Sequence, residues 1–381
     1  MASLPATQRA VAMAAKRAPY VELEVPVYPP AAGEVIVRVG WTASTPLDLH
    51  RADGGLLIPS YPRQAGGGGI AGTVMAVGSA GDLKSLAVGD RVMAFAFHGD
   101  KEANHQEYVT LPAYLVSRVP ECLTLQEACT VPANLVTVFH TATADLELEL
   151  PWPIPQGWTP KAADRPILVW GASSSVGIFA VQVLRHWGYR QVLAVSSRRH
   201  HDYLRRIGAT ACFDYTKPGV VESILGHVKD HAQGEPAVPS ILDCIGSLDG
   251  TLLPLTEIAQ RGTRVAIMLP VILKDATEDD EPEYEMDVAK CHADRWADGV
   301  ILRGARTHHY LQDTKFEGQN VFFKQNLQPE IVPALLAERV VEPNKQRVVE
   351  GATMVERAQN ALHLLRGKAV SGERLVWKVS L

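Results

Sequence analysis

The chain has 381 residues and a formal net charge of −5, so it is long enough for two domains with substantial cores and carries no basic excess. No basic run or basic-aromatic stripe indicates a nucleic-acid partner, and no apolar run approaches the roughly 20 residues that a membrane helix requires. The five cysteines are odd in number and widely scattered, which argues against a disulfide framework and for a reducing compartment.

The first third of the chain predicts a β-rich domain. Strand-like runs at 8–14, 20–27, 34–39, 70–77, 91–97 and 107–111 are separated by Gly, Pro and Asp turns. The four glycines at 66–69 precede a strand and do not join a strand to a helix, so they predict a tight corner and not a phosphate loop. The first 21 residues contain three basic residues and no acid, as in mitochondrial transit peptides. Since strands already occupy this region, we expect an opening β-structure and a cytoplasmic protein.

The middle of the chain changes its periodicity. A helix is predicted at 131–144, followed by a surface excursion rich in Pro and Trp at 146–165. Strands at 167–170, 191–196, 212–214, 240–245 and 264–268 then alternate with helices that begin near 175, 200, 220 and 248. Repeated units of this kind predict a parallel, doubly wound sheet.

The last part of the chain is simpler. An acidic segment at 275–287 predicts a solvated loop. Amphipathic helices follow from 315, and a final strand is expected at 374–379.

The stretch at 167–187 organises the second half of the chain. A buried strand stops at Gly171, small residues follow, and a helical pattern runs from Ser175 to Trp187. A strand, a tight turn and a helix N-terminus together make a pyrophosphate site, because the backbone approaches the phosphates and the free N–H groups supply positive potential. The spacing departs from G-x-G-x-x-G, since serines stand around the middle glycine position. A turn made for packing alone is therefore the alternative.

The end of the next strand predicts the cofactor. A site that prefers NAD places Asp or Glu there to bind the ribose 2′-hydroxyl. This chain instead has Ser197, Arg198, Arg199 and His200. Two guanidinium groups and no acid suit a 2′-phosphate, so the cofactor is predicted to be NADPH. The alternative is that both arginines are solvated loop charges.

Several motifs, in order along nearly the whole chain, resemble the medium-chain dehydrogenases/reductases. They are Thr45-Pro46-Leu47-Asp48, the 67–72 corner, Val88-Gly89-Asp90-Arg91-Val92, the 171–177 turn, Leu204 with Ile207-Gly208-Ala209, Phe213-Asp214-Tyr215, Leu242-Asp243-Cys244-Ile245-Gly246 and Ser371-Gly372-Glu373-Arg374-Leu375-Val376. The resemblance implies an α/β protein with a GroES-like β-rich catalytic domain at 1–136, completed by 306–381. It also implies a Rossmann domain with a doubly wound parallel sheet at 137–305, which binds NADPH.

The resemblance is to the zinc-free branch of that superfamily. Where zinc alcohol dehydrogenases carry catalytic ligands, this chain has Thr45, Gly68, Gly69 and Ala133, and 97–105 contains no Cys for a structural zinc lobe. No metal is therefore predicted. The turn, the Pro- and Trp-rich excursion and the chain ending are most similar to the fungal trans-acting enoyl reductases, with quinone-reductase-like proteins as further relatives.

The resemblance also carries cofactor residues over to this chain. The implied pyrophosphate contacts are Ser173, Ser174, Ser175 and Val176. The implied 2′-phosphate contacts are Ser197 and Arg199, with Tyr215 on the adenosine side. The residue pattern of the turn and of the next strand end adds Gly171, Gly177, Arg198 and His200 as predicted cofactor contacts. Leu47, Asp48, Cys244 and Ile245 match residues near the nicotinamide, and Ser371 and Gly372 match residues that close the cofactor cleft.

Two residues match substrate-side positions and are the catalytic candidates. His50 stands where many relatives carry Lys, and Thr137 lies on the predicted helix that opens onto the nicotinamide. His50 would donate a proton or polarise a carbonyl, and Thr137 would hydrogen-bond its oxygen. A structural or ribose contact of His50 is an equal alternative. Asp48 is expected to hold the turn and not to act as a base.

The predicted function is NADPH-dependent reduction of the C=C bond of an α,β-unsaturated carbonyl or enoyl thioester, in polyketide-type metabolism and on a carrier-bound intermediate. NADPH quinone reduction is the alternative, and a non-catalytic NADPH-binding protein is a distant one. The resemblance leaves a monomer and a homodimer open, the latter through an edge strand at 299–303.

Overall fold

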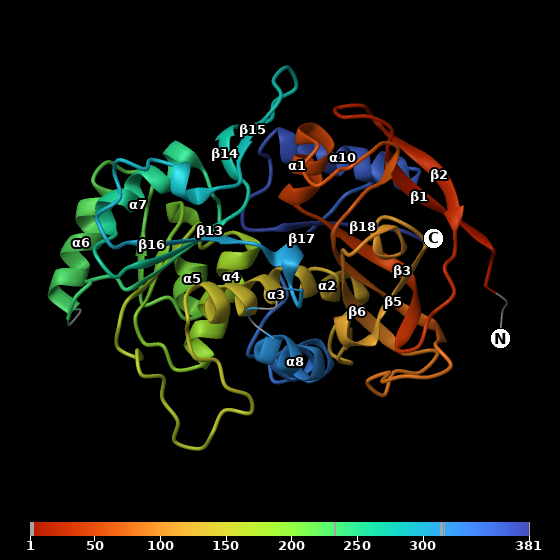
Figure 1. Ribbon diagram of the computed structural model, residues 1–381, viewed down its shortest axis with the longest axis horizontal. Helices are drawn as coiled ribbons and strands as arrows, with labels where there is room; N and C mark the ends of the chain where they lie inside the picture. Colours follow the sequence, from red (N-terminus) through yellow and green to blue (C-terminus); the bar gives the residue numbers. More distant parts are fainter. Residues whose placement is uncertain (1–3, 232–233, 313–314, 316, 381) are drawn as a thin grey trace. The chain divides into compact units, whose positions relative to one another are not determined.

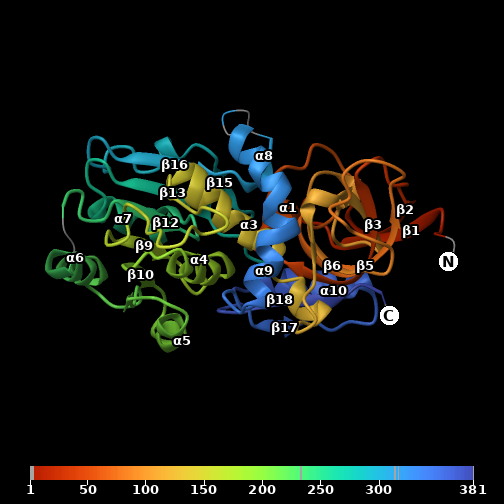
Figure 2. The ribbon, with the colours of Figure 1, turned by 90° about the horizontal axis from the view of Figure 1, so that it is seen from below.

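The computed structural model describes residues 4–231, 234–312, 315 and 317–380. The chain forms two compact units. The first unit comprises Met1–Val136, Ala276–Pro282 and His308–Leu381, and the second comprises Thr137–Asp275 and Glu283–Thr307. Figures 1 and 2 show the elements of each unit in two views.

The first unit is built on antiparallel sheets. In its described residues the larger sheet has the order β17 (Gln346–Val348), β18 (Arg374–Lys378), β3 (Glu34–Ser44), β5 (Gly68–Val77), β6 (Arg91–Ala96) and β8 (Val116–Arg118), with β7 (Tyr108–Pro112) also paired to β3. A smaller sheet has the order β2 (Tyr20–Pro26), β1 (Thr7–Met13) and β4 (Arg63–Gln64). The end of the chain thus returns to its beginning, since β18 pairs with β3 and places Trp377 opposite Thr42.

Helices complete the first unit. They are α1 (Pro46–Gly54), α2 (Leu125–Ala128), α8 (Glu317–Asn326), α9 (Val332–Ala337) and α10 (Met354–Arg366). The helix predicted at 131–144 is α3 (Pro132–His140), which continues as a π-helical turn at Thr141–Asp145. The boundary between the two units falls inside α3, between Val136 and Thr137.

The second unit contains the predicted parallel sheet. Its described strands have the order β11 (Ala211–Phe213), β10 (Val192–Val195), β9 (Ile167–Trp170), β12 (Ser240–Asp243), β13 (Arg264–Met268) and β16 (Ile301–Ala305), and all neighbours are parallel. This is the doubly wound order, in which the strand order reverses beside β9. The predicted α/β fold class is confirmed.

Helices cover the parallel sheet on both faces. α6 (Val220–His231) and α7 (Leu253–Ile258) pack their apolar side chains on one face, with Ile224, Leu255 and Ile258 fully buried against the strands. α4 (Ser175–His186) contacts β9 and β10, and Figure 1 shows it on the other side of the sheet from α7. α5 (His201–Arg206) follows β10. Gly188 follows α4 with φ +86°, as predicted for the residue after a helix end.

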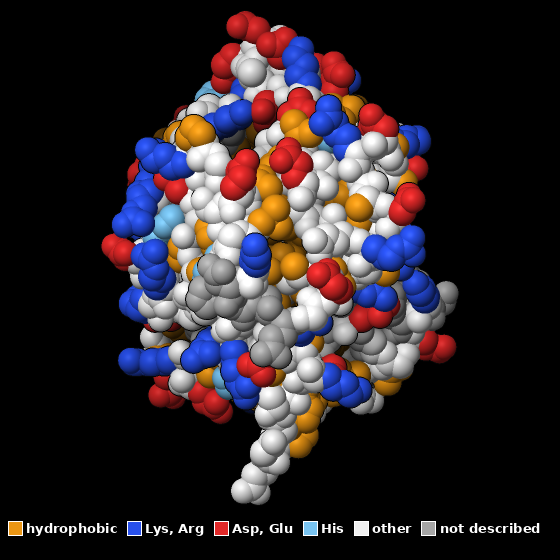
Figure 3. All heavy atoms as spheres, turned by 90° about the vertical axis from the view of Figure 1, so that its left-hand side faces the viewer, with side chains coloured by type: hydrophobic (Ala, Val, Ile, Leu, Met, Phe, Trp, Pro, Cys, Tyr) orange, Lys and Arg blue, Asp and Glu red, His pale blue; other side chains and the backbone are white. Residues whose placement is uncertain are grey.

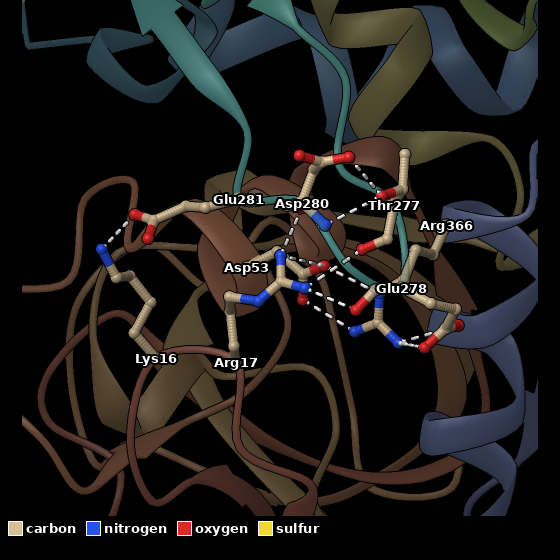
Figure 4. A network of polar contacts seen from close by, with 8 residues as sticks. All are labelled: Lys16, Arg17, Asp53, Thr277, Glu278, Asp280, Glu281 and Arg366. Carbon is tan, nitrogen blue, oxygen red and sulfur yellow. Dashed lines mark hydrogen bonds and ion pairs between the residues drawn. The ribbon is translucent and has the colours of Figure 1, made fainter.

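The acidic segment predicted as a solvated loop is instead fastened to the first unit. It is the tip of a hairpin whose strands, β14 (Val271–Lys274) and β15 (Glu283–Glu285), belong to the second unit, while Ala276–Pro282 belongs to the first. Figure 4 shows the tip lying against basic side chains. The Arg17 guanidinium donates to the carbonyl oxygens of Thr277 and Glu278 at 3.1 and 2.8 Å, and Lys16 pairs with Glu281. Sequence periodicity could not show this, because the partners lie about 260 residues away.

A buried carboxylate anchors the same contact. Asp53, at the end of α1, is fully buried and accepts two hydrogen bonds of 2.8 Å from Arg366, which also pairs with Glu278 at 3.3 Å. The hydrogen bonds to Asp53 raise the pKa of Arg366. Removing Arg366 would take both short hydrogen bonds from the buried Asp53 carboxylate, and breaking a buried ion pair typically costs about 3–5 kcal/mol.

Candidate functional site

The turn after β9 has the geometry of a phosphate-binding turn. Gly171 adopts φ +73°, and a Cβ there would lie 2.6 Å from Ile245 Cγ1. The Ala172 N–H donates to the Val195 carbonyl at 2.9 Å, and the Ser174 N–H donates to the Gly171 carbonyl at 2.8 Å. The chain therefore reverses tightly here and leads directly into α4.

The start of α4 explains the serines in the motif. Ser174 is the N-cap, and its Oγ accepts the Gly177 N–H at 3.1 Å. Gly177 itself has no room for a side chain, because a Cβ would lie 2.6 Å from both Ala172 Cα and the Gly171 carbonyl oxygen. The two glycines thus permit the tight turn and the close helix contact, while serine takes the capping role. The N-terminus of this 12-residue helix therefore lies at the turn. Such an end attracts anions through its free N–H groups and the helix dipole.

The predicted cofactor residues of the second unit meet at one edge of the sheet. Because its strands are parallel, the residues that follow β9, β10, β11 and β12 all lie at their shared carboxyl edge. Tyr215 and Ile245 follow two of these strands, and their side chains are 52% and 41% exposed. Ile245 lies against Gly171 of the turn, and exposed apolar side chains at this edge suit the faces of a nucleotide.

The end of β10 carries the two arginines. Ser197 precedes a 3-10 turn at Arg198–His200, and both arginine side chains are exposed. Their settings differ, since the Arg199 Nε donates to His200 Nε2 at 3.2 Å whereas Arg198 lines a cavity. No carboxylate stands in this turn, so the features on which the NADPH prediction depends are all present at the sheet edge.

The cavity lies between the ends of β10 and β11 and the start of α6. Its volume is about 680 Å³. It is lined by Arg198, His201, Cys212, Phe213, Asp214, Thr216, Lys217, Pro218, Val220 and Ser223. Sequence reasoning found Arg198 but missed Lys217, which stands two residues beyond the predicted contact Tyr215.

A buried aspartate that sequence reasoning had treated only as part of a motif holds the loop after β12. The Asp243 carboxylate is fully buried and accepts the N–H groups of Ile245 and Gly246 at 3.0 and 3.2 Å and the Thr251 hydroxyl at 2.6 Å. Burial raises its pKa to about 6. Asp243 therefore positions Cys244 and Ile245, both predicted cofactor contacts. Burial also raises the pKa of the Cys244 thiol, which forms a hydrogen bond with the side chain of Ser174 across the turn.

In the first unit, α1 positions the predicted nicotinamide-side residues. Thr45 caps the helix, because its hydroxyl oxygen accepts the Leu47 N–H at 3.0 Å. The Asp48 carboxylate in turn accepts the Thr45 N–H at 2.6 Å. Burial opposes the charge of Asp48, but His105, 3.5 Å away, and the Thr45 N–H outweigh it, so its pKa lies below the ordinary value. Asp48 is thus a carboxylate that holds the turn, and only 3% of it is exposed.

The structure also shows why the glycine run is a corner. A Cβ on Gly66 would lie 2.1 Å from Asn104 Oδ1, and one on Gly69 would lie 2.2 Å from the Cys129 carbonyl oxygen. Gly68 lies beside Thr45, with 3.3 Å between its would-be Cβ and the Thr45 methyl. Two of the positions compared with zinc ligands, Thr45 and Gly68, are therefore neighbours in space. Among the described residues, no group of three or more His, Cys, Asp or Glu could hold a metal ion.

The two catalytic candidates belong to different units. His50 lies on α1 in the first unit with its side chain partly exposed, and its carbonyl accepts the Leu56 N–H at 3.2 Å. Thr137 lies on the part of α3 that belongs to the second unit and is 8% exposed. Ser371 is exposed and Gly372 adopts φ +68°, both in the first unit before β18. The roles of these residues remain predictions.

Comparison with known proteins first gives the class. Residues 31–139 match the family described as alcohol dehydrogenase GroES-like domain. The fold is that of the Escherichia coli quinone oxidoreductase complexed with NADPH, with a TM-score of 0.68 at 16% identity over 98% of this chain and 100% of that one. The protein is a medium-chain dehydrogenase/reductase, an oxidoreductase.

Two curated relatives narrow the class. The trans-enoyl reductase opdC of Penicillium oxalicum is 31% identical over 287 residues, which cover 73% of this chain and 74% of that protein. The trans-enoyl reductase traG of Penicillium crustosum is 26% identical over 99% of this chain and 98% of that protein. The chain belongs to the family of the trans-enoyl reductases.

Proposed function

We propose that this protein reduces the C=C bond of an α,β-unsaturated carbonyl, in particular an enoyl thioester, with hydride from NADPH. Membership of the trans-enoyl reductase family supports the reaction. One observation at the sheet edge supports the choice of cofactor: a capped phosphate turn is followed on the next strand by Ser197, Arg198 and Arg199 in place of an acid. NADPH supplies the hydride, and the chain supplies binding, orientation and charge stabilisation.

The second unit would hold the cofactor through several kinds of contact. The N–H groups at the start of α4 would bind the pyrophosphate, and the gap left by the two glycines lets the backbone come close. The cations after β10 would bind the 2′-phosphate. The exposed face of Tyr215 would pack against the adenosine, and that of Ile245 would pack on the nicotinamide side. Asp243 would hold the loop that carries Ile245 in place.

The substrate needs two further groups. When hydride reaches the β-carbon, negative charge develops on the carbonyl oxygen, and a hydrogen-bond donor there lowers the barrier. We assign this role to the Thr137 hydroxyl. The α-carbon must then take a proton, and we assign His50 as the donor, because an imidazole changes its charge near neutral pH.

The first experiment follows NADPH oxidation by the purified protein in three arms: an enoyl thioester, a quinone, and an alcohol with NADP⁺. Saturated thioester as the product supports the proposal. Turnover of the quinone alone replaces it with NADPH quinone reduction, and NADPH binding without turnover in any arm indicates a non-catalytic NADPH-binding protein.

Two variants then test the residue roles. His50→Gln and Thr137→Val should each lower kcat for the enoyl thioester by roughly 10²–10³-fold while NADPH affinity changes little. His363→Gln on α10 and Thr143→Val in the π-helical turn are matched controls and should be neutral. Full activity of His50→Gln would return His50 to a structural or ribose contact.

Since the relatives are named trans-enoyl reductases, we propose that the substrate is a polyketide-type thioester on a separate carrier protein. We further propose a cytoplasmic protein. None of the helices in the described part of the chain is long and apolar enough to cross a bilayer.

The charge distribution fits a small-molecule substrate. Figure 3, which views the side of the molecule carrying α6, shows Lys and Arg mixed with Asp and Glu over the described atoms, as expected for a protein without a nucleic-acid partner. The oligomeric state, a monomer or a homodimer through the β16 edge, is tested by light scattering of the purified chain.

A further inference from the structure

The helix that carries His50 buries charged side chains. The buried residues of α1 are Asp48, Arg51, Ala52 and Asp53. We infer that His105, which contacts Asp48, is a positioning residue for the proposed reduction and fixes the direction in which the His50 imidazole points. The inference rests on the proposed function, because it takes His50 as the proton donor.

Helix geometry places His50 away from the buried face of α1. Since successive helical residues are rotated by about 100°, His50 points about 200° away from Asp48 around the helix axis. Their exposure agrees, because Asp48 is buried and His50 is partly exposed. The helix has only 9 residues, so the contacts of its buried face decide its rotation about its own axis. That rotation decides where the His50 side chain points.

Each buried charge of α1 is held by a group from another part of the chain. The Arg51 guanidinium donates to the Gly66 carbonyl. Asp53 accepts two hydrogen bonds from Arg366, as Figure 4 shows. Because hydrogen bonds are directional and apolar contacts are not, these contacts fix the rotation of the helix as well as its position.

Asp48 is the corresponding anchor in the first turn, and His105 is its partner. Asp48 Oδ2 accepts the Thr45 N–H at 2.6 Å, and the other oxygen, Oδ1, lies 3.5 Å from His105 Nε2. Oδ1 has no hydrogen bond among the described residues, so the imidazole is its ion-pair partner. Burial opposes the charge of Asp48, and His105 contributes most to holding its pKa below the ordinary value.

The imidazole is itself fixed on its other sides. His105 is 1% exposed, its Nδ1 lies 3.3 Å from Thr42 Oγ1, and its ring centroid lies 4.7 Å from that of Trp377. The Thr42 hydroxyl accepts the Asn104 amide N–H at 2.7 Å. When Thr42 donates to Nδ1, the neutral imidazole carries its proton on Nε2, where it faces Asp48. Two strands, β3 and β18, thus set the group that holds the first turn of α1.

Other titratable groups act on the charge of Asp48 and stay in place when His105 is replaced. They are Arg51 of α1, Tyr20 of β2 and Arg374 of β18. A change in the pH dependence of turnover on replacing His105 therefore reports the His105 contact.

The test replaces His105 by Phe, which keeps a ring against Trp377 and removes both nitrogens. We expect His105→Phe to lower kcat for the enoyl thioester by roughly 10- to 100-fold and to change KM and NADPH affinity by less than about twofold, because His50 is misaligned but present. The acid limb of the kcat profile should move to higher pH, since the imidazole no longer lowers the pKa of Asp48. His105→Gln, whose amide still donates to Asp48, should recover most of the turnover.

A double variant shows whether His105 acts through Asp48. In that case His105→Phe lowers kcat little further in a chain that already carries Asp48→Asn. His98→Phe is the matched control, because His98 pairs at 3.1 Å with Glu102, a carboxylate outside α1. It should keep the wild-type kcat and pH profile.

Thermal unfolding shows which variants are folded. If His105→Phe does not fold, Thr42→Val removes the hydroxyl that orients the imidazole and should lower kcat by roughly two- to tenfold. Full turnover of the folded variant, or a double variant whose loss is the product of the two single losses, overturns the inference and leaves the proposed function standing. If the wild type binds NADPH but does not reduce the enoyl thioester, the proposed function fails and the inference fails with it.

Discussion

Two glycine-containing stretches, one in each unit, differ in what occupies the space beside the glycines. Around the 66–69 corner, the space that side chains would occupy is filled by the protein itself, with Asn104 and the Cys129 carbonyl at the positions of the missing Cβ atoms. Around the 171–177 turn, two glycines let the backbone fold tightly, and the serines between them remain partly exposed at the start of α4. Glycine serves internal packing in the first case and an open binding edge in the second.

The buried carboxylates of the two units show a similar contrast. Asp48 has His105 close by, which helps to hold its pKa below the ordinary value. Asp243 accepts hydrogen bonds from two backbone N–H groups and the Thr251 hydroxyl, and burial raises its pKa to about 6. The carboxylate in the first unit is therefore fixed by charge as well as hydrogen bonds. The carboxylate in the second unit is held by these hydrogen bonds, and its raised pKa makes its ionisation sensitive to pH near 6.

The largest effect is expected from Gly177→Ala. The new methyl group would lie 2.6 Å from backbone atoms of the turn, which cannot move without opening it. We expect 2′,5′-ADP affinity to fall by roughly 10²-fold, which corresponds to overpacking of about 2–3 kcal/mol. Calorimetry measures the loss. Gly226→Ala in α6 is the control, since no atom lies within 4 Å of its would-be Cβ, and it should bind normally.

Gly69→Ala should lower the stability of the first unit and leave nucleotide affinity nearly unchanged. Its methyl group would lie 2.2 Å from the Cys129 carbonyl oxygen, so the first unit should lose roughly 2–3 kcal/mol of stability. Binding of 2′,5′-ADP, which depends on the second unit, should stay within about twofold. Thermal unfolding and calorimetry on one sample separate the two effects. Gly318→Ala in α8 has open space around it and should be neutral. A loss of nucleotide affinity in Gly69→Ala would contradict the division of roles.

The pH dependence of stability should reveal Asp243. Its pKa is raised from 3.8 to about 6 in the folded chain, so its stabilising contribution is complete below about pH 3.8 and is lost as the pH rises through about 6. The unfolding free energy of the wild type, measured relative to Asp243→Asn, should therefore fall by about 2 kcal/mol between pH 4.5 and 7.5. Denaturant unfolding across this range measures it. A difference that does not vary with pH would contradict the raised pKa.

The smallest effect on turnover is expected from removing or adding metal ions. Since the positions compared with zinc ligands carry Thr45, Gly68, Gly69 and Ala133, neither EDTA nor added Zn²⁺ should change the turnover of the enoyl thioester by more than about 20%. Elemental analysis of the purified chain should find zinc well below one ion per chain. Stoichiometric zinc that is needed for turnover would remove the contrast between the filled corner and the open turn.

Sequence by itself determined the fold class and the main elements of the cofactor edge. Hydrophobic periodicity and turn residues are local properties, so the strands at Ile167–Trp170 and Arg264–Met268 and the start of α4 follow from them directly. The missing acid after β10 is equally local, and it was enough to predict the cofactor.

Only the tertiary structure showed which residues far apart in the sequence contact one another. It placed Lys217 and Arg198 on one cavity, gave Asp243 the loop that it holds, and fastened the acidic tip at Ala276–Pro282 to Arg17 and Arg366. These contacts join residues from different strands, or residues that are hundreds of positions apart, and local periodicity carries no information about them. The physical reason is that burial and charge pairing depend on which side chains the folded chain brings within a few ångströms of one another, whereas secondary structure depends mainly on neighbours in the sequence.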